Sequence, residues 1–274
     1  MVERTFAIGG EDEIHRLGFG AMRLCGPDIL GEPDDVEGAK RLVRRAVELG
    51  VDLIDTADAY GPGTSERLLR EALDLPRDDV LVATKGGLLR NRDGDWVARG
   101  DPAHLRNAHL CSCDRLGVET IDLYQLHTPR SETPVEESVR ALAELRDEGV
   151  IRHVGVSNVT VDQLERARDV CEIATVQNRY NVGNRADDDV LELCEAEGIG
   201  FIPWFPLGAG SLDVEGLDEV AAAHDATRAQ VALAWLLGRS PVILPIPGTS
   251  SVEHLEQNVA AAGVDLTDEE VARL

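Results

Sequence analysis

Short apolar runs alternate with helical patterns along the whole chain. Each run is rich in β-branched residues and is followed by a polar turn, then by apolar positions three or four residues apart. The alternation recurs roughly every 30 residues. The pattern predicts eight strands, at residues 16–22, 51–55, 80–85, 121–127, 151–157, 174–177, 200–204 and 242–246.

The expected helices begin and end at recognisable signals. Asp101 followed by Pro102 is an N-cap with proline at the first helical position. Capping boxes are expected at Thr133 with Glu136 (where Pro134 would take the first helical position), at Thr160 with Gln163, and at Ser250 with Glu253. Glycine is expected to end four helices, at Gly50, Gly117, Gly149 and Gly198.

Eight strand–helix alternations fit either a (β/α)₈ barrel or a doubly wound sheet. The strand count favours the barrel, as does the absence of a G-x-G-x-x-G turn after the first strand. Residues 205–240 hold more helix than one unit needs, and 265–274 are expected to form a last capped helix. We therefore expect one α/β domain over residues 1–274, a TIM barrel with extra C-terminal helices.

Polar, aromatic or glycine residues stand directly after almost every predicted strand. In a barrel the carboxyl ends of the strands meet on one face, where barrel enzymes place their chemistry. The residues in these positions are Asp55, Lys85, His127, Ser157, Asn158, Gln177, Trp204, Gly248 and Thr249. The sequence therefore predicts one site on that face.

Lys85 is one of only two lysines in a chain that has 25 arginines. It ends a buried type of strand, and Asp55, at the end of a neighbouring strand, is its natural counter-ion. Tyr60 follows in the loop TADAYG; an ammonium beside its phenol is expected to lower the pKa and make Tyr60 a proton donor. Purely structural explanations also exist for these candidates. Lys85 would be an incidental lysine, Tyr60 a loop residue packed on Pro62, and His127 a hydrogen-bonded structural histidine.

The formal net charge of the 274-residue chain is −24. Such a charge argues against binding nucleic acid or anionic membranes through bulk electrostatics. The acidic residues fit an ordinary solvated surface or adaptation to high salt, and a GC-rich genome also explains the excess of arginine over lysine. The five cysteines do not have disulfide spacing and are expected to be reduced, and no metal site is predicted. No signal-like or membrane-spanning apolar run is present, so we expect a soluble cytoplasmic protein.

Six motifs together resemble the aldo-keto reductases: LIDTADAYG, ATKGG, YQLH, HVGVSN, VQNRYN and IPGTS. The resemblance covers about residues 14–262 and implies a (β/α)₈ barrel that binds a nicotinamide cofactor. It implies that Tyr60 is the general acid, that Lys85 lowers its pKa, that Asp55 pairs with Lys85, and that His127 orients and polarises the substrate carbonyl. The segment GFGAMRLCGP is similar to a bacterial and archaeal branch near the pyridoxal reductases.

The resemblance also implies a set of cofactor-binding residues. Ser157, Asn158 and Gln177 would bind the carboxamide, and Trp204 would stack on the nicotinamide ring. The remaining expected cofactor contacts are Met22, Arg23, Phe205, Pro206, Leu207, Gly208, Gly248, Thr249, Ser250, His254, Gln257 and Asn258. Gly248 and His254 stand where the family often has lysine and arginine; NADP(H) is still the expected cofactor, with NAD(H) as the alternative.

The expected function is an oxidoreductase that interconverts a small-molecule aldehyde or ketone with its alcohol. The alternatives are a non-catalytic barrel that binds the cofactor and regulates a partner, and a lyase or isomerase that uses Lys85 as a Schiff base. Specificity is expected from the loops 25–33, 86–100, 128–131, 179–186 and 208–214. Arg90, Arg92 and Arg99 in the second loop would either attract anionic substrates or be merely solvated. The oligomeric state is left open, and a monomer fits the family.

Overall fold

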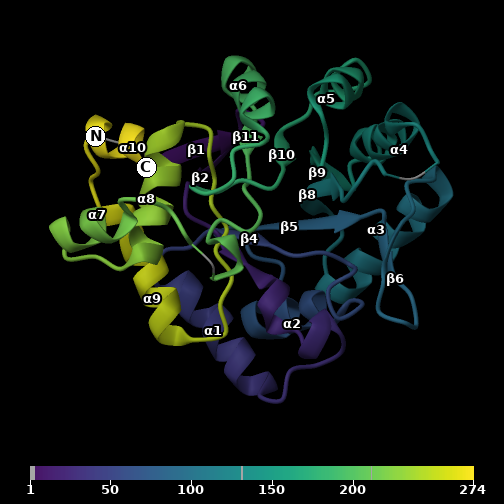
Figure 1. Ribbon diagram of the computed structural model, residues 1–274. Helices are drawn as coiled ribbons and strands as arrows, with labels where there is room; N and C mark the ends of the chain where they lie inside the picture. Colours follow the sequence, from purple (N-terminus) through teal and green to yellow (C-terminus); the bar gives the residue numbers. More distant parts are fainter. Residues whose placement is uncertain (1–3, 131, 211) are drawn as a thin grey trace.

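The computed structural model describes residues 4–130, 132–210 and 212–274. Over these residues seven parallel strands form one curved sheet, and helices surround it (Figure 1). Each strand pairs with the next one along the chain: β3 (Phe19–Gly20), β4 (Leu53–Asp55), β5 (Leu81–Gly86), β8 (Ile121–Leu126), β9 (Ile151–Ser157), β10 (Thr175–Gln177) and β11 (Gly200–Phe201). These strands confirm seven of the eight predicted positions.

The last predicted strand closes the barrel as an extended segment without a full ladder. On one side it exchanges two backbone hydrogen bonds of 2.8 Å with Phe201 of β11. On the other side the amide of Gly18 donates to the carbonyl of Pro245 at 2.9 Å. The amide of Gly20 donates to the carbonyl of Pro247 at 3.4 Å. Because proline has no N–H, the segment can accept but not donate at these two positions, and the pairing stays one-sided.

The outer layer consists of helices that pack on the sheet and on one another. They are α1 (Val36–Glu48), α2 (Thr64–Leu73), α3 (Pro102–Leu116), α4 (Val135–Asp147), α5 (Val161–Arg168), α6 (Asp188–Glu197), α7 (Leu217–Ala223), α8 (Arg228–Arg239), α9 (Val252–Ala260) and α10 (Asp268–Arg273). Helix α9 contacts α1, so the helical layer closes around the barrel as the sheet does (Figure 1). Helices α7, α8 and α10 confirm the expected additional helices. None of the helices in these described ranges is long and apolar enough to cross a membrane.

The helix ends confirm some of the predicted signals and correct others. Asp101 caps α3 and accepts a hydrogen bond from the amide of His104 at 3.0 Å. The capping box at Thr160 is formed at the start of α5. The predicted glycines lie at the helix ends with positive φ angles, at Gly50, Gly117, Gly149 and Gly198.

Two predicted capping boxes were placed one residue too early. Helix α4 has Pro134 as its N-cap, because proline suits the extended conformation found there, so Thr133 lies outside the helix. Helix α9 is capped by Ser251, whose hydroxyl accepts a hydrogen bond from the amide of His254 at 3.4 Å. Ser250 therefore precedes the cap and does not form a box with Glu253.

Two antiparallel hairpins were not predicted as strands. One is β1 (Thr5–Ile8) with β2 (Asp12–His15), and the other is β6 (Leu88–Arg90) with β7 (Trp96–Ala98). Their strands are too short to show a period, but glycine-containing turn signals, Gly9-Gly10 and Asp93-Gly94, connect them. The β6–β7 hairpin replaces the loop that the sequence indicated at 86–100.

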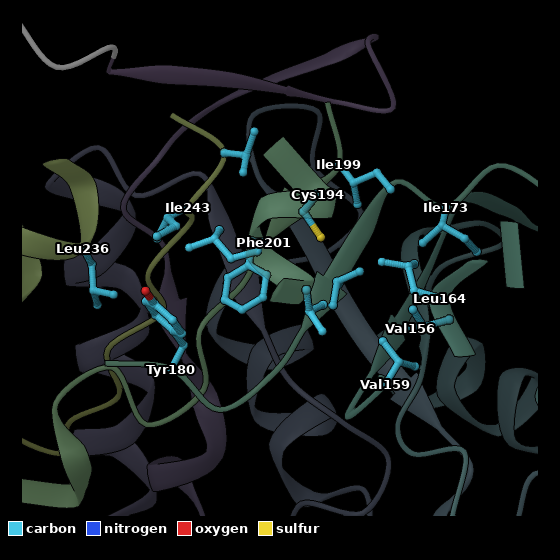
Figure 2. Packing of buried hydrophobic residues seen from close by; sticks show 14 of the residues in the cluster. Val156, Val159, Leu164, Ile173, Tyr180, Cys194, Ile199, Phe201, Leu236 and Ile243 are labelled. Atoms are coloured by element: carbon cyan, nitrogen blue, oxygen red, sulfur yellow. The ribbon is translucent and has the colours of Figure 1, made fainter. Parts of the chain in front are cut away.

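The largest apolar cluster lies between the later strands and the helices outside them. Figure 2 shows Val156 and Phe201 of the sheet among side chains that include Leu164 of α5 and Cys194 of α6. Tyr180 packs edge-on against Phe201, with ring centres 5.6 Å apart. All five cysteines are free thiols, as the sequence indicated.

Candidate active site

A cleft of about 660 Å³ opens at the carboxyl ends of the strands. Fifteen of the predicted site residues line it: Met22, Arg23, Asp55, Tyr60, His127, Ser157, Asn158, Gln177, Trp204, Phe205, Pro206, Leu207, Gly248, Thr249 and Ser250. The barrel brings these residues together from positions up to 228 apart in the sequence, because parallel strands all end on the same face.

Asp55, at the floor of the cleft, forms a buried ion pair with Lys85 beneath it. The Nζ atom of Lys85 lies 2.7 Å from Oδ2 of Asp55 and donates to the carbonyl of Thr56 at 2.7 Å. The side-chain Nε2 of Gln177 donates to the other carboxylate oxygen, Oδ1 of Asp55, at 2.8 Å. The side chains of Lys85 and Asp55 are 0% and 3% exposed, so each charge depends on these partners in place of water.

Tyr60 lies above this pair. The Nζ atom of Lys85 is 5.2 Å from the centre of the Tyr60 ring. Burial raises the pKa of Tyr60 above its ordinary value, and the charge and hydrogen bond of Lys85 oppose only part of that rise. The direction differs from the sequence-based expectation, which considered the ammonium but not the burial of the phenol. Burial also lowers the pKa of Lys85, but the charges of Asp55 and Tyr60 outweigh it and leave that pKa raised.

His127 completes the floor of the cleft. Its ring lies edge-on to Tyr60, with ring centres 6.0 Å apart. Burial, and secondly the charge of Lys85, hold the pKa of His127 well below its ordinary value, so the imidazole is neutral near pH 7. Its Nδ1 atom is buried and has no hydrogen-bond partner among the described residues. Buried polar atoms are rarely left without a partner, so this site can accommodate a ligand group.

Asn158 and Trp204 are held together on one wall of the cleft. The Nε1 atom of Trp204 donates to Oδ1 of Asn158 at 3.1 Å, and Nδ2 of Asn158 donates to the carbonyl of His127 at 3.0 Å. Phe205 packs edge-on against Trp204 at 4.9 Å between ring centres. The indole is therefore fixed before any ligand arrives, as a stacking surface requires.

The other end of the cleft is built on the start of α9. A Cβ atom at Gly248 would lie 2.7 Å from the carbonyl oxygen of Gly20, so this backbone position has no room for a side chain. The hydroxyl of Thr249 accepts a hydrogen bond from the amide of Ser251 at 3.0 Å. The free amides of the first turn of α9 make this end attractive to a phosphate.

Few cations reach the cleft. Residues 248–258 contain no lysine or arginine. Arg23 is the one lysine or arginine among the described lining residues, and its Cγ lies beside Gly248. The donor groups and the fixed indole fit a nicotinamide dinucleotide.

Five predicted site residues do not line the cleft. Lys85 lies beneath it, whereas Gly208, His254, Gln257 and Asn258 lie outside its walls. Asn258 is 5% exposed, because it is on the inner side of α9. The predicted specificity loops include Ser131 and Ser211, which lie outside the described residues.

The sequence indicated part of the site only as loops. Ile29, Leu88 and Trp96 line the cleft from within the predicted specificity loops 25–33 and 86–100, in a short 3₁₀ turn (η2, Pro27–Ile29) and in the β6–β7 hairpin, but the sequence singled out none of the three. Asp58 lies behind the floor; its burial, and secondly the charge of Glu66, raise its pKa to about 8. The Asp93-Gly94 turn was the available signal for Trp96, and nothing in the motif TADAYG distinguished Asp58.

Residues 16–274 match the model of the aldo/keto reductase family. The chain belongs to this family. It is 48% identical to an uncharacterized oxidoreductase of Schizosaccharomyces pombe, over 97% of this chain and 87% of that protein. It is 43% identical to the pyridoxine 4-dehydrogenase of Escherichia coli, over 100% of this chain and 98% of that protein.

A solved aldo/keto reductase from Klebsiella pneumoniae, in complex with NADP and acetate, superposes with a TM-score of 0.83. It is 29% identical to this protein, and the alignment covers 99% of this chain and 94% of the other. Membership of this family makes the protein an NAD(P)H-dependent oxidoreductase with a (β/α)₈ barrel.

Proposed function

We propose that the protein reduces an aldehyde or ketone to the alcohol, or catalyses the reverse reaction, with Tyr60 as the general acid. The observation that carries the proposal is the position of Tyr60 and His127 at the floor of the cleft, directly above the buried pair of Lys85 and Asp55. A regulatory barrel that only binds the cofactor would not need this buried pair, which is costly to desolvate.

The four residues have complementary parts in the proton transfer. The raised pKa of Tyr60 keeps its phenol protonated at neutral pH, so the acid form is available. When the phenol gives its proton to the carbonyl oxygen, the Lys85 ammonium stabilises the phenolate left behind. Asp55 keeps Lys85 charged and in place, and neutral His127 can donate a hydrogen bond to the same carbonyl oxygen.

The proposed cofactor is NADP(H), which in its reduced form supplies the hydride. Ser157, Asn158 and Gln177 would hold the carboxamide, and Trp204 would cover one face of the ring. Thr249, Ser250 and the first turn of α9 would receive the 2′-phosphate, the group that NADP(H) has and NAD(H) lacks, with Arg23 nearby. The complex of the K. pneumoniae relative with NADP supports this choice over NAD(H).

Replacing Tyr60 by phenylalanine tests the general acid. Tyr60→Phe keeps the ring and its packing but removes the proton, and turnover should fall by roughly 10²- to 10⁴-fold. The panel of carbonyl compounds should include pyridoxal, because the E. coli relative is named pyridoxine 4-dehydrogenase. NADPH binding, followed by fluorescence, should remain as in the unmodified protein. Turnover that survives in Tyr60→Phe would refute the assigned role.

A further inference from the structure

Arg90 lies at the end of β6, and it bonds to two separate segments that contribute Ile29 and Trp96 to the cleft beside Tyr60. Its Nη1 donates to the carbonyl of Ile29 at 3.2 Å and its Nη2 to the carbonyl of Asp28 at 2.9 Å. Its Nε and Nη2 donate to the carbonyl of Gly94, at 3.1 and 2.8 Å, across the turn of its own hairpin. The guanidinium therefore bridges the η2 turn and the β6–β7 hairpin.

Arg90 also supports Trp96 directly. Its guanidinium carbon lies 4.0 Å from the centre of a Trp96 ring, a distance typical of stacking between arginine and an indole. Trp96 is 42% exposed and lies edge-on to both Tyr60 and His127, with ring centres 6.4 Å away in each case. The indole thus depends on Arg90 for its support on one face.

The segment that Arg90 holds has an unfavourable backbone conformation. Asp28 and Ile29 have φ angles of 55° and 60°, in the left-handed region. A β-branched residue rarely adopts this region, so the surrounding structure must hold Ile29 there. The carbonyl of Ile29 accepts two hydrogen bonds, one from Arg90 and one at 3.1 Å from the amide of Gly61, next to Tyr60.

We propose that Arg90 is a positioning residue for the carbonyl substrate, which acts by holding Ile29 and Trp96 as walls beside Tyr60 and His127. It does so with four hydrogen bonds to three backbone carbonyls and with its flat face on the indole, a combination that lysine cannot reproduce. Four of its five N–H donors are committed to these carbonyls, so the anion-binding alternative for Arg90 is not favoured. The proposal rests on the proposed carbonyl reduction, since it specifies how the substrate end of that site is built.

The test compares Arg90→Met with Arg92→Met, a matched substitution in the same hairpin. Arg92 is exposed and makes none of the bonds that Arg90 makes. With benzaldehyde as the probe and NADPH in excess, Arg90→Met should raise KM by roughly tenfold, because an aromatic contact and its support are lost. The dissociation constant of NADPH and the melting temperature should stay close to those of Arg92→Met. Arg90→Lys should behave like Arg90→Met.

Two further measurements separate positioning from general loosening. In a Trp96→Ala background the effect of Arg90→Met on KM should become much smaller, because coupled residues are not additive. Hydrogen exchange should be faster at Gly61 in Arg90→Met than in Arg92→Met, and this readout needs no activity. If the unmodified protein reduces no aldehyde, the proposed function fails while the exchange experiment still tests Arg90. The proposal would be overturned if Arg90→Met left both KM and the exchange at Gly61 unchanged. It would also be overturned if Arg90→Met weakened NADPH binding as much as it raised KM, or if it raised KM by the same factor in the Trp96→Ala background.

Discussion

The two ends of the cleft differ in the groups that they offer to a ligand. The strand-end region (Asp55, Lys85, His127 and Gln177) is 0% to 8% exposed and contains opposite charges joined at 2.7 Å. The helix-end region (residues 248–258) offers hydroxyls and free amides, has no lysine or arginine, and is largely exposed apart from Thr249, Leu255 and Asn258. Both regions take part in one proposed site, yet only the first contains buried charge.

The difference follows from what each region is proposed to do. A proton donor needs an environment that responds to the charge it leaves behind, and a fixed ammonium in a low dielectric provides that response. A phosphate that stays anionic throughout needs only donors, and a helix start supplies them without an added charge. In a chain with a net charge of −24, the helix-end region should therefore bind more weakly and respond more to salt.

Lys85→Met should have the largest effect, because it removes the buried ammonium that pairs with Asp55 and lies beside Tyr60. Turnover should fall by roughly 10²-fold or more, since the phenolate of Tyr60 loses its stabilising charge. The free energy of unfolding should also fall, by ~3–5 kcal/mol, because Asp55 is left buried without its counter-ion. Steady-state kinetics and chemical denaturation measure the two effects.

The double variant Asp55→Asn/Lys85→Met separates stability from chemistry. It removes both charges, so most of the lost stability should return while turnover stays low. A double variant that regains turnover would show that Lys85 acts only by neutralising Asp55.

The sequence was informative about the strand-end region for a physical reason. Asp55, Lys85 and His127 follow apolar strands, and the barrel topology brings all strand ends together whatever the details of packing. What sequence patterns could not supply was burial: it raises the pKa of Tyr60 and so reverses the expected direction. The same holds for Trp96, whose place beside Tyr60 depends on a hairpin that was expected to be a loop.

Asp58→Asn is the next test, and it probes a buried acid behind the strand-end region. Asp58 has a pKa of about 8, above its ordinary 3.8, so the folded state binds this proton more tightly than the unfolded state does. The stability associated with that proton is complete below about pH 4 and is lost as the pH rises through 8. Asparagine stays neutral at every pH, so the free energy of unfolding of the variant should not fall in this way as the pH rises.

Thermal unfolding from pH 5 to pH 9 measures the effect of Asp58→Asn. Its melting temperature should rise relative to the unmodified protein as the pH increases, by more than about 3 °C at pH 9, the shift that about 1 kcal/mol produces at this size. Asp78→Asn, at an exposed position, should follow the unmodified protein throughout. If the melting temperatures of Asp58→Asn and of the unmodified protein changed with pH in the same way, the carboxyl of Asp58 would be ionised in the folded protein.

Ser250→Arg should have the smallest effect, and it tests whether the helix-end region lacks only charge. Ser250 lines the cleft next to the start of α9, and Gly248 has no room for a side chain, so 250 is the position at which a cation can be added. A guanidinium beside a phosphate forms charge-assisted hydrogen bonds, and the dissociation constant of NADPH should fall by roughly fivefold to tenfold. NADH lacks the extra phosphate and should gain less. Ser250→Gln, of similar length without charge, is the control, and the gain should shrink as salt is added. An equal gain for both cofactors would place the new cation on the shared pyrophosphate and would show that the start of α9 does not receive the 2′-phosphate.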